Sequence, residues 1–267
     1  MHRVLATAIS IVAMTGPALA ADAVQLYAAG SLRSALTEVG AAFEGAIGVK
    51  VQAKFGASGT LKDEIAGGTP AQVFASANME HPQALAAAKK SGPVVLFAHN
   101  QLCALARPGL AVATATLLDA MLDPTVKLGT STPQADPSGD YAWEVFRKAE
   151  RLRPGAFATL ERKAQQLVGG PTAPTAPPGH SVYAMLIAEG RADLFLTYCT
   201  NAVEARKEVT AATVVALPDE LAVGADYGLT VLADAPPDAY RLAMFILSAE
   251  GQRALAKYGF GTPTLPR

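Results

Sequence analysis

Short apolar stretches of strand length alternate along this 267-residue chain with amphipathic stretches of helical length, and small-residue turns join them. The first apolar stretch, residues 24–29, runs into Gly30 and Ser31, after which apolar residues recur at helical spacing until Gly45 and Gly48. This alternation predicts an α/β fold built on mostly parallel sheets. We expect further strands at 49–55, 71–75, 102–106, 126–129, 194–198, 213–217 and 227–232, and further helices at 60–66, 80–90, 182–189, 237–248 and 251–258, with another directly after 137–139.

The first twenty residues have the pattern of a secretory signal peptide. Arg3 precedes an apolar run over 4–14, and the segment ends in Ala18, Leu19 and Ala20, a small-residue cleavage pattern. This run is too short to cross a bilayer, and no later stretch reaches the roughly 20 apolar residues that a membrane helix needs. We therefore expect an exported protein that is cleaved near Ala20 and is soluble in the periplasm.

The charge balance of the chain excludes several classes of partner. It carries 22 Lys and Arg against 23 Asp and Glu, a formal net charge of −1. No basic excess points to nucleic acid or to a membrane surface, and the spacing of His, Cys and carboxylates matches no zinc or iron cluster. We expect a monomer without a cofactor, in which local geometry rather than bulk charge attracts any anionic ligand.

The two cysteines, Cys103 and Cys199, allow two interpretations. An even number of cysteines in an oxidising compartment favours a disulfide. Two buried free thiols acting as small hydrophobic side chains are the alternative. Geometry decides between these states, so the sequence leaves both open.

Several predicted strand-to-helix junctions share one design, in which a hydroxyl follows a turn of small residues. They lie at Ser31, Ser58, Ser138 and the His180-Ser181 pair. The start of a helix presents unpaired backbone N–H groups, and these groups together with the helix dipole attract an anion. One such serine is ordinary N-capping. Several of them at the carboxyl ends of strands, in an exported chain without a catalytic motif, predict a shared anion site.

The stretch 26–78 resembles the opening of the periplasmic molybdate-binding proteins of ABC importers. A strand ends in a Ser-Leu turn at Ser31, an aromatic-x-x-Ser loop reaches from Phe55 to Ser58, and a Pro-Ala-x-x-Phe segment follows, with Gln72 where that family usually has Asp. The similarity resumes at 136–146, 190–204 and 244–260, so that it covers the mature chain in order apart from the proline-rich stretch 169–179, which we expect to be a surface loop.

This resemblance implies a type II periplasmic-binding-protein fold, in which crossover strands join two α/β lobes. Lobe I would comprise 21–103 and 223–267, and lobe II would comprise 104–222. The implied function is capture of a tetrahedral oxyanion, molybdate or tungstate, in the cleft between the lobes and its delivery to the membrane permease of an ABC importer. The metal would be held only as its oxyanion.

The resemblance also implies a set of neutral donors at specific positions. Ser31 and Ser58 would provide hydroxyl and amide donors, Ser138 a backbone amide at a helix start, and Tyr198 a phenol. A further amide would come from the turn at His180 or Ser181, and the proline-rich loop leaves the choice between these two open. Asp136 beside the pocket is similar to a carboxylate that approaches the metal in some relatives, which leaves the identity of the oxyanion open.

Three alternatives remain at this stage. The first is a binding protein for sulfate, phosphate or a small organic anion. The second is a hydrolase that uses one of the serines, although the chain contains no Gly-x-Ser-x-Gly motif and no marked triad. The third is an effector-sensing domain, against which export and the lack of a DNA-binding segment argue. We expect a binding protein and no enzyme.

Overall fold

The computed structural model describes residues 23–263, and the predicted signal peptide, residues 1–20, lies outside this range. No helix within the range is long and apolar enough to cross a membrane. The strands are β1 (Val24–Ala29), β2 (Val51–Gly56), β3 (Val73–Ser76), β4 (Val95–Ala106), β5 (Leu128–Ser131), β6 (Gln165–Val168), β7 (Leu194–Tyr198), β8 (Thr213–Ala216) and β9 (Gly224–Val231). The α-helices are α1 (Arg33–Ile47), α2 (Ser58–Ala66), α3 (Glu80–Ala87), α4 (Leu117–Leu122), α5 (Pro137–Leu152), α6 (Ala156–Lys163), α7 (Val182–Ala188), α8 (Cys199–Glu208), α9 (Pro237–Leu247) and α10 (Ala249–Lys257).

The sheet has two parallel parts that antiparallel strands connect. Its order is β2-β1-β3-β9-β4-β7-β5-β6, and β8 pairs with β4. Strand β1 is parallel to β2 and β3, and β5 is parallel to β6 and β7. Strand β9 is antiparallel to β3 and β4, and β4 is antiparallel to β7 and β8. The predicted α/β class is confirmed, but the expectation of mostly parallel sheets is wrong, because four strand pairs are parallel and four are antiparallel. The antiparallel pairs all involve β4 or β9, the two long strands that connect the parallel parts.

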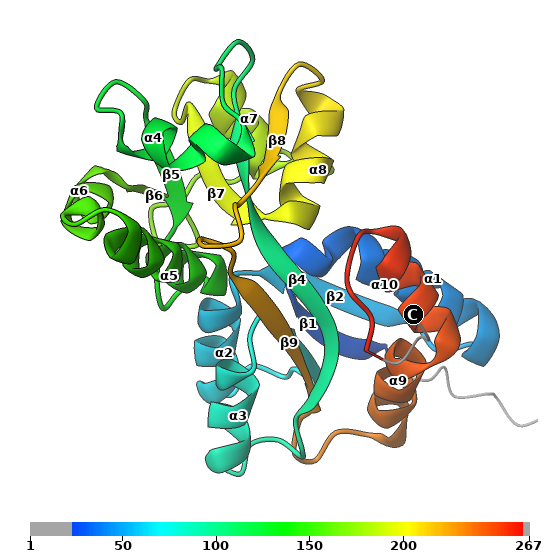
Figure 1. Ribbon diagram of the computed structural model, residues 1–267. Coiled ribbons are helices and arrows are strands. Elements are labelled where there is room, and N and C mark those ends of the chain that lie inside the picture. Colours follow the sequence, from blue (N-terminus) through cyan, green and yellow to red (C-terminus); the bar gives the residue numbers. More distant parts are fainter. Residues whose placement is uncertain (1–22, 264–267) are drawn as a thin grey trace, which may run out of the picture.

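Strand β4 belongs to both parts of the molecule (Figure 1). Its residues 95–101 pair with β9, its residues 102–106 pair with β7, and its residues 103–106 also pair with β8. Figure 1 shows helices α1, α2, α3, α9 and α10 around the first part, and α4 to α8 around the second. The predicted lobe boundaries fall inside β4 and just ahead of β9, and the division into lobes stays a prediction.

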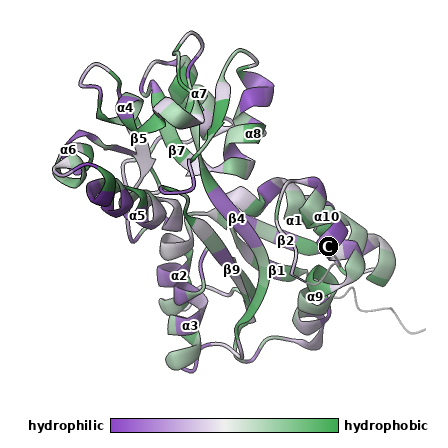
Figure 2. Cartoon of the chain, viewed as in Figure 1, coloured by the Kyte–Doolittle hydropathy of each residue, from purple (hydrophilic) through white to green (hydrophobic). Residues whose placement is uncertain are grey.

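The helices cover the strands with apolar faces. In α5 the buried residues Ala142, Val145, Phe146 and Ala149 recur at helical spacing and join the main core. Figure 2 shows hydrophilic residues on the rest of this helix and on α8. Burial of one stripe on each helix therefore fixes its orientation on the sheet, and this positions the helix starts described below.

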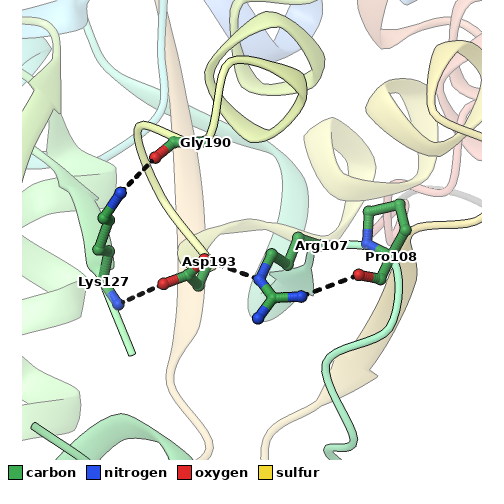
Figure 3. Close-up of polar contacts among 5 residues, drawn as sticks. All are labelled: Arg107, Pro108, Lys127, Gly190 and Asp193. Atoms are coloured by element: carbon green, nitrogen blue, oxygen red, sulfur yellow. Dashed lines mark hydrogen bonds and ion pairs between the residues drawn. The ribbon is translucent and has the colours of Figure 1, made fainter. Parts of the chain in front are cut away.

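A network of hydrogen bonds joins three neighbouring segments in the second part of the molecule (Figure 3). The Asp193 carboxylate, just ahead of β7, accepts hydrogen bonds from Arg107 Nε at 2.7 Å and from the Lys127 backbone N–H at 2.8 Å. Lys127 Nζ donates in turn to the Gly190 carbonyl at 2.9 Å. This network ties the end of β4 to the segments that lead into β5 and β7.

Cys103 in β4 and Cys199 at the start of α8 form a disulfide, with Cα atoms 4.8 Å apart. Cys199 directly follows Tyr198, the last residue of β7. Of the two states that the sequence leaves open, the structure has the bonded one. The bond fixes the β7–α8 junction against the strand that joins the two parts.

Candidate functional site

The predicted serine and tyrosine donors lie at carboxyl ends of strands, where open α/β sheets bind their ligands. Ser31 follows β1, Ser58 follows β2 and begins α2, and Tyr198 ends β7. Ser138 lies in the first turn of α5, beyond the loop that follows β5. Hydrogen bonds and aromatic contacts connect these positions through residues that the sequence did not single out.

Tyr227 of β9 is the partner of Ser31. The Ser31 Oγ and the Tyr227 Oη lie 2.9 Å apart, and Asn100 Nδ2 donates to the same phenol oxygen at 3.1 Å. Asn100 Nδ2 also donates to Thr200 Oγ1 at 2.9 Å. Because Asn100 donates to the phenol, Tyr227 can give its own proton to Ser31, and the Ser31 hydroxyl then has a proton available for a ligand.

Ala77, which follows β3, connects Ser58 with Tyr198. Its backbone N–H donates to Ser58 Oγ at 3.1 Å, and its carbonyl accepts a hydrogen bond from Tyr198 Oη at 3.2 Å. Ser58 thus acts as an acceptor here and keeps its own proton for donation. The rings of Tyr198 and Tyr227 have centroids 5.5 Å apart, which brings the Ser58 and Ser31 positions into one cluster.

The start of α5 contributes a second polar group to this region. The Asp136 carboxylate caps the helix by accepting a hydrogen bond from the Ser138 N–H at 3.0 Å. The Ser138 Oγ is fully buried and has no hydrogen-bond partner in the part of the chain that the structure describes. The same is true of Ser131 Oγ at the end of β5, which the sequence did not identify. Buried hydroxyls normally have partners, so both are candidate ligand donors.

The N-terminus of α2 contacts the loop that leads into α5. The Gly59 N–H, in the first turn of α2, donates to the Ala135 carbonyl at 2.9 Å. A Cβ on Gly59 would lie 2.1 Å from the Gln134 carbonyl oxygen, far inside van der Waals contact. Glycine is therefore required for this approach, which joins the first part of the molecule to the second.

Burial raises the pKa of the ionisable groups in the cluster. It raises the pKa of Asp136 to about 6, against the hydrogen bond from the Ser138 N–H and the nearby Ser131 hydroxyl, which lower it. Burial is also the largest cause that raises the pKa of Tyr198 and of Tyr227 above the ordinary value of a phenol. Both phenols therefore stay protonated near neutral pH and can act as donors.

A raised carboxyl pKa has a defined effect on stability. Because the folded protein holds the Asp136 proton more tightly than the unfolded chain, stability falls as the pH rises from about 4 to about 6 and stays reduced above this range. Replacing Asp136 with Asn keeps the helix cap and removes the charge. At pH 8 we expect the free energy of unfolding of the Asp136→Asn variant to exceed that of the wild type by at most about 3 kcal/mol, and its melting temperature to be higher accordingly. Near pH 4 the two proteins should be equally stable. Melting curves of both proteins across this range test the expectation, and a constant difference between them would contradict it.

The turn at His180 and Ser181 makes other contacts. The Glu208 carboxylate of α8 accepts from the Ser181 N–H at 2.7 Å and pairs with His180 Nδ1 at 3.1 Å. The His180 side chain is 61% exposed. Within residues 23–263, no hydrogen bond joins this turn to Ser31 or Ser58. Glu208 occupies the Ser181 amide, one of the two amides between which the resemblance left the choice open. The ligand role of His180 and Ser181 stays a prediction.

A cavity of about 380 Å³ opens beside the cluster. Asn78, the residue after Ala77, and Pro137, between Asp136 and Ser138, contribute to its wall. Ser31, Ser58, Ser138 and Tyr198 themselves do not line this cavity. Its lining is Lys62, Asn78, Glu80, His81, Gln134, Pro137, Asp140 and Tyr141.

Comparison with known proteins gives the class of this chain. The profile of a family described as bacterial extracellular solute-binding protein matches residues 24–261. An uncharacterized protein of Pasteurella multocida is 34% identical over 238 residues, which cover 88% of this chain and 97% of that protein. The molybdate-binding protein ModA of Mycobacterium tuberculosis is 27% identical over 254 residues, or 93% of this chain and 88% of ModA.

Solved structures share the architecture at low sequence identity. The periplasmic molybdate-binding protein of Azotobacter vinelandii has a TM-score of 0.71 at 17% identity, with 91% of this chain and 100% of that chain covered. The sulfate-binding protein SubI of Mycobacterium tuberculosis has a TM-score of 0.74 at 18% identity, with 91% and 87% covered. The fold is thus that of the type II periplasmic binding proteins, as predicted. The chain belongs to the bacterial extracellular solute-binding protein family.

Proposed function

We propose that this protein captures a tetrahedral oxyanion, molybdate or tungstate, between its two lobes and delivers it to the membrane permease of an ABC importer. The observation that carries the proposal is the convergence of Ser31, Ser58 and Tyr198 on one buried cluster beside the start of α5. The predicted signal peptide places this function in the periplasm. The protein acts as a monomer that binds and releases the anion without chemical change.

Neutral donors suit reversible capture of a dianion. In residues 23–263, no hydrogen bond joins Ser31, Ser58, Ser138 or Tyr198 to a Lys, Arg or His side chain. The nearby Arg33 lies over the Phe55 ring, with its guanidinium carbon 4.9 Å from the ring centroid. Several hydrogen bonds of moderate strength replace the hydration shell of the anion and still permit its release.

Closure of the lobes around the anion provides the signal to the permease. Tyr198 Oη and Gly59 N–H each make a hydrogen bond from one part of the molecule to the other. A ligand bound between these parts adds contacts that exist only in the closed form, so it shifts the population to that form. The similarity to ModA over 93% of this chain supports molybdate as the ligand.

Thermal unfolding against a panel of anions tests the proposal. We expect molybdate and tungstate to raise the melting temperature of the mature protein strongly, and sulfate and phosphate to raise it less, because the cavity selects by size. A ligand at a hundred times its Kd adds about 2.7 kcal/mol of stability. A stronger shift with sulfate would instead favour the alternative, sulfate binding, which the shared fold of SubI makes the first to consider. No shift with any anion would contradict the proposal.

Removal of single donors should weaken binding in a graded way. A hydrogen bond to a charged ligand contributes about 1.5–3 kcal/mol. We therefore expect Ser58→Ala and Tyr198→Phe each to raise the Kd for molybdate about ten- to a hundredfold, as measured by isothermal titration calorimetry. Ser91→Ala and Tyr258→Phe are matched controls, because the Ser91 hydroxyl donates to the neighbouring Gly92 carbonyl and the Tyr258 hydroxyl donates to Glu38 at the surface. Unchanged affinity in both test variants would place the anion elsewhere.

A further inference from the structure

A single buried acid lies within the proposed anion site. Among the buried polar residues of the described part of the chain, Asp136 is the one with a carboxyl group. All the others are serine, threonine, asparagine or glutamine. Asp136 caps the helix whose start faces the site, and the unpartnered hydroxyls of Ser131 and Ser138 lie close to it. An inference from this arrangement rests on the proposed function, because it concerns the charge of Asp136 beside a bound anion.

The position of this carboxyl group is fixed by packing. A Cβ on Gly169, in the loop that follows β6, would lie 2.6 Å from the Asp136 Cβ and 3.5 Å from the Ala57 Cβ. The Asp136 backbone N–H donates to the Thr132 carbonyl at 2.9 Å. The Asp136 side chain, which packs against Gly169, is therefore only 9% exposed. It stays beside any anion that reaches the first turn of α5.

No cation compensates the carboxylate. Within residues 23–263, no salt bridge or side-chain hydrogen bond joins Asp136 to Lys, Arg or His. The α2 start contributes the uncharged residues Ala57, Ser58 and Gly59, and the loop at 169–170 contributes glycine. Two neighbouring side chains influence the pKa of Asp136: the Asp140 charge one turn along α5 raises it, and the Ser131 hydroxyl of β5 lowers it. The Asp136 charge in turn contributes to the raised pKa of Tyr183 in α7, Tyr198 in β7 and Tyr227 in β9.

Helix capping alone does not require a charge at this position, because Asn caps a helix as well as Asp does. A buried carboxylate beside a bound dianion would suffer repulsion from a like charge in a medium of low dielectric constant. The repulsion disappears if the pair holds one proton, and a protonated carboxyl group then becomes an additional hydrogen-bond donor.

We propose that Asp136 couples anion capture to the uptake of one proton, so that a fully ionised dianion binds to the protonated form of this side chain. The proton comes from solvent and adds to one carboxylate oxygen, which then donates it in a hydrogen bond to an oxygen of the anion. Loss of that proton restores the repulsion and favours release. Asp136 thus acts as a specificity-determining residue that makes affinity depend on pH.

Calorimetric titration of the mature protein with molybdate, and separately with sulfate, tests this coupling. Both anions remain fully ionised from about pH 6.5 to about pH 8.5, so any proton taken up goes to the protein. Measurement in two buffers of different ionisation enthalpy gives the number of protons bound per anion. The wild type should take up about one proton near pH 8, and its affinity should fall roughly tenfold per pH unit above pH 7.

The Asp136→Asn variant should bind with an affinity that does not vary over this range, take up no proton, and bind more tightly than the wild type at pH 8. Asp238→Asn is the matched control, since it removes a carboxylate from the first turn of α9, where Asp238 pairs with Arg241, and should preserve the proton uptake. Binding by the wild type without proton uptake, or equal uptake by Asp136→Asn, would overturn the coupling and leave the proposed function intact. Absence of anion binding by the wild type at every pH would overturn both.

Discussion

A Gly59→Ala variant should lose about a hundredfold in affinity for the anion while remaining folded. The added Cβ would lie 2.1 Å from the Gln134 carbonyl oxygen and 2.7 Å from the Ala135 carbonyl oxygen. Both are backbone atoms, so the loop before α5 must move, and overpacking of this kind costs about 1–3 kcal/mol. Under the proposed function, the cost would fall on the closed form that holds the ligand.

The fold of the Gly59→Ala variant should not suffer, because alanine favours a helix over glycine by up to about 1 kcal/mol. Titration calorimetry gives the affinity, and the melting temperature without ligand reports the fold. Gly45→Ala in α1 is the matched control, since a Cβ there would meet no atom within 4 Å. Binding of molybdate by Gly59→Ala within about threefold of the wild type would show that the approach of α2 to the loop at 134–135 is not needed for capture.

Loss of the disulfide should reduce the free energy of unfolding by about 2–5 kcal/mol. Cys103 and Cys199 are 96 residues apart in the sequence, so their bond closes a long loop and restricts the unfolded chain strongly. We expect a Cys103→Ala/Cys199→Ala double variant to unfold at a clearly lower urea concentration than the wild type. The same shift should appear when the wild type is reduced with dithiothreitol.

The reductant also supplies the control for this prediction. Dithiothreitol should not change the unfolding of the double variant, because that variant has no disulfide to reduce. Equal unfolding midpoints for the oxidised wild type and the double variant would mean that the bond does not stabilise the fold. Because Cys199 follows Tyr198, the affinity of the double variant for molybdate reports separately whether the bond also positions the phenol.

Elements with a clear apolar pattern were predictable from the sequence. The strand expected at 49–55 is β2 (Val51–Gly56), and the helix expected at 251–258 is α10 (Ala249–Lys257). Strand β4 was expected only at 102–106, but it begins at Val95. Its first half contains polar residues such as His99 and Gln101, which pairing with β9 accommodates and an apolar pattern does not reveal.

Helix α8 (Cys199–Glu208) was not predicted for a related reason. Its buried residues are only Thr200, Ala202 and Ala205, and it has no large apolar side chain on its inner face. The disulfide at its first residue and its packing on β4 hold it in place. Tertiary contacts therefore determine this helix, and a local hydrophobic pattern cannot show them.

The positions of the candidate donors in the fold were predictable where they depend on local geometry, and their role as ligands stays a prediction. Ser31, Ser58 and Ser138 follow from the strand–turn–helix pattern, and the structure places them at helix starts. Tyr227 and Asn100 escaped prediction because their partners are distant in the chain. Tyr227 lies 196 residues from Ser31, and no periodicity in the sequence reports such a pairing. The contact of Glu208 with the turn at 180–181 escaped for the same reason.

The position of a bound anion tests the central claim most directly. Crystals of the mature protein grown with molybdate can be measured by anomalous diffraction, which locates the molybdenum atom independently of the protein. We predict one strong peak between the lobes, with the oxygens of the anion within hydrogen-bond distance of Ser31, Ser58 and Tyr198. A peak at another surface, or none at a saturating concentration of molybdate, would contradict the proposal that these strand ends form an oxyanion site.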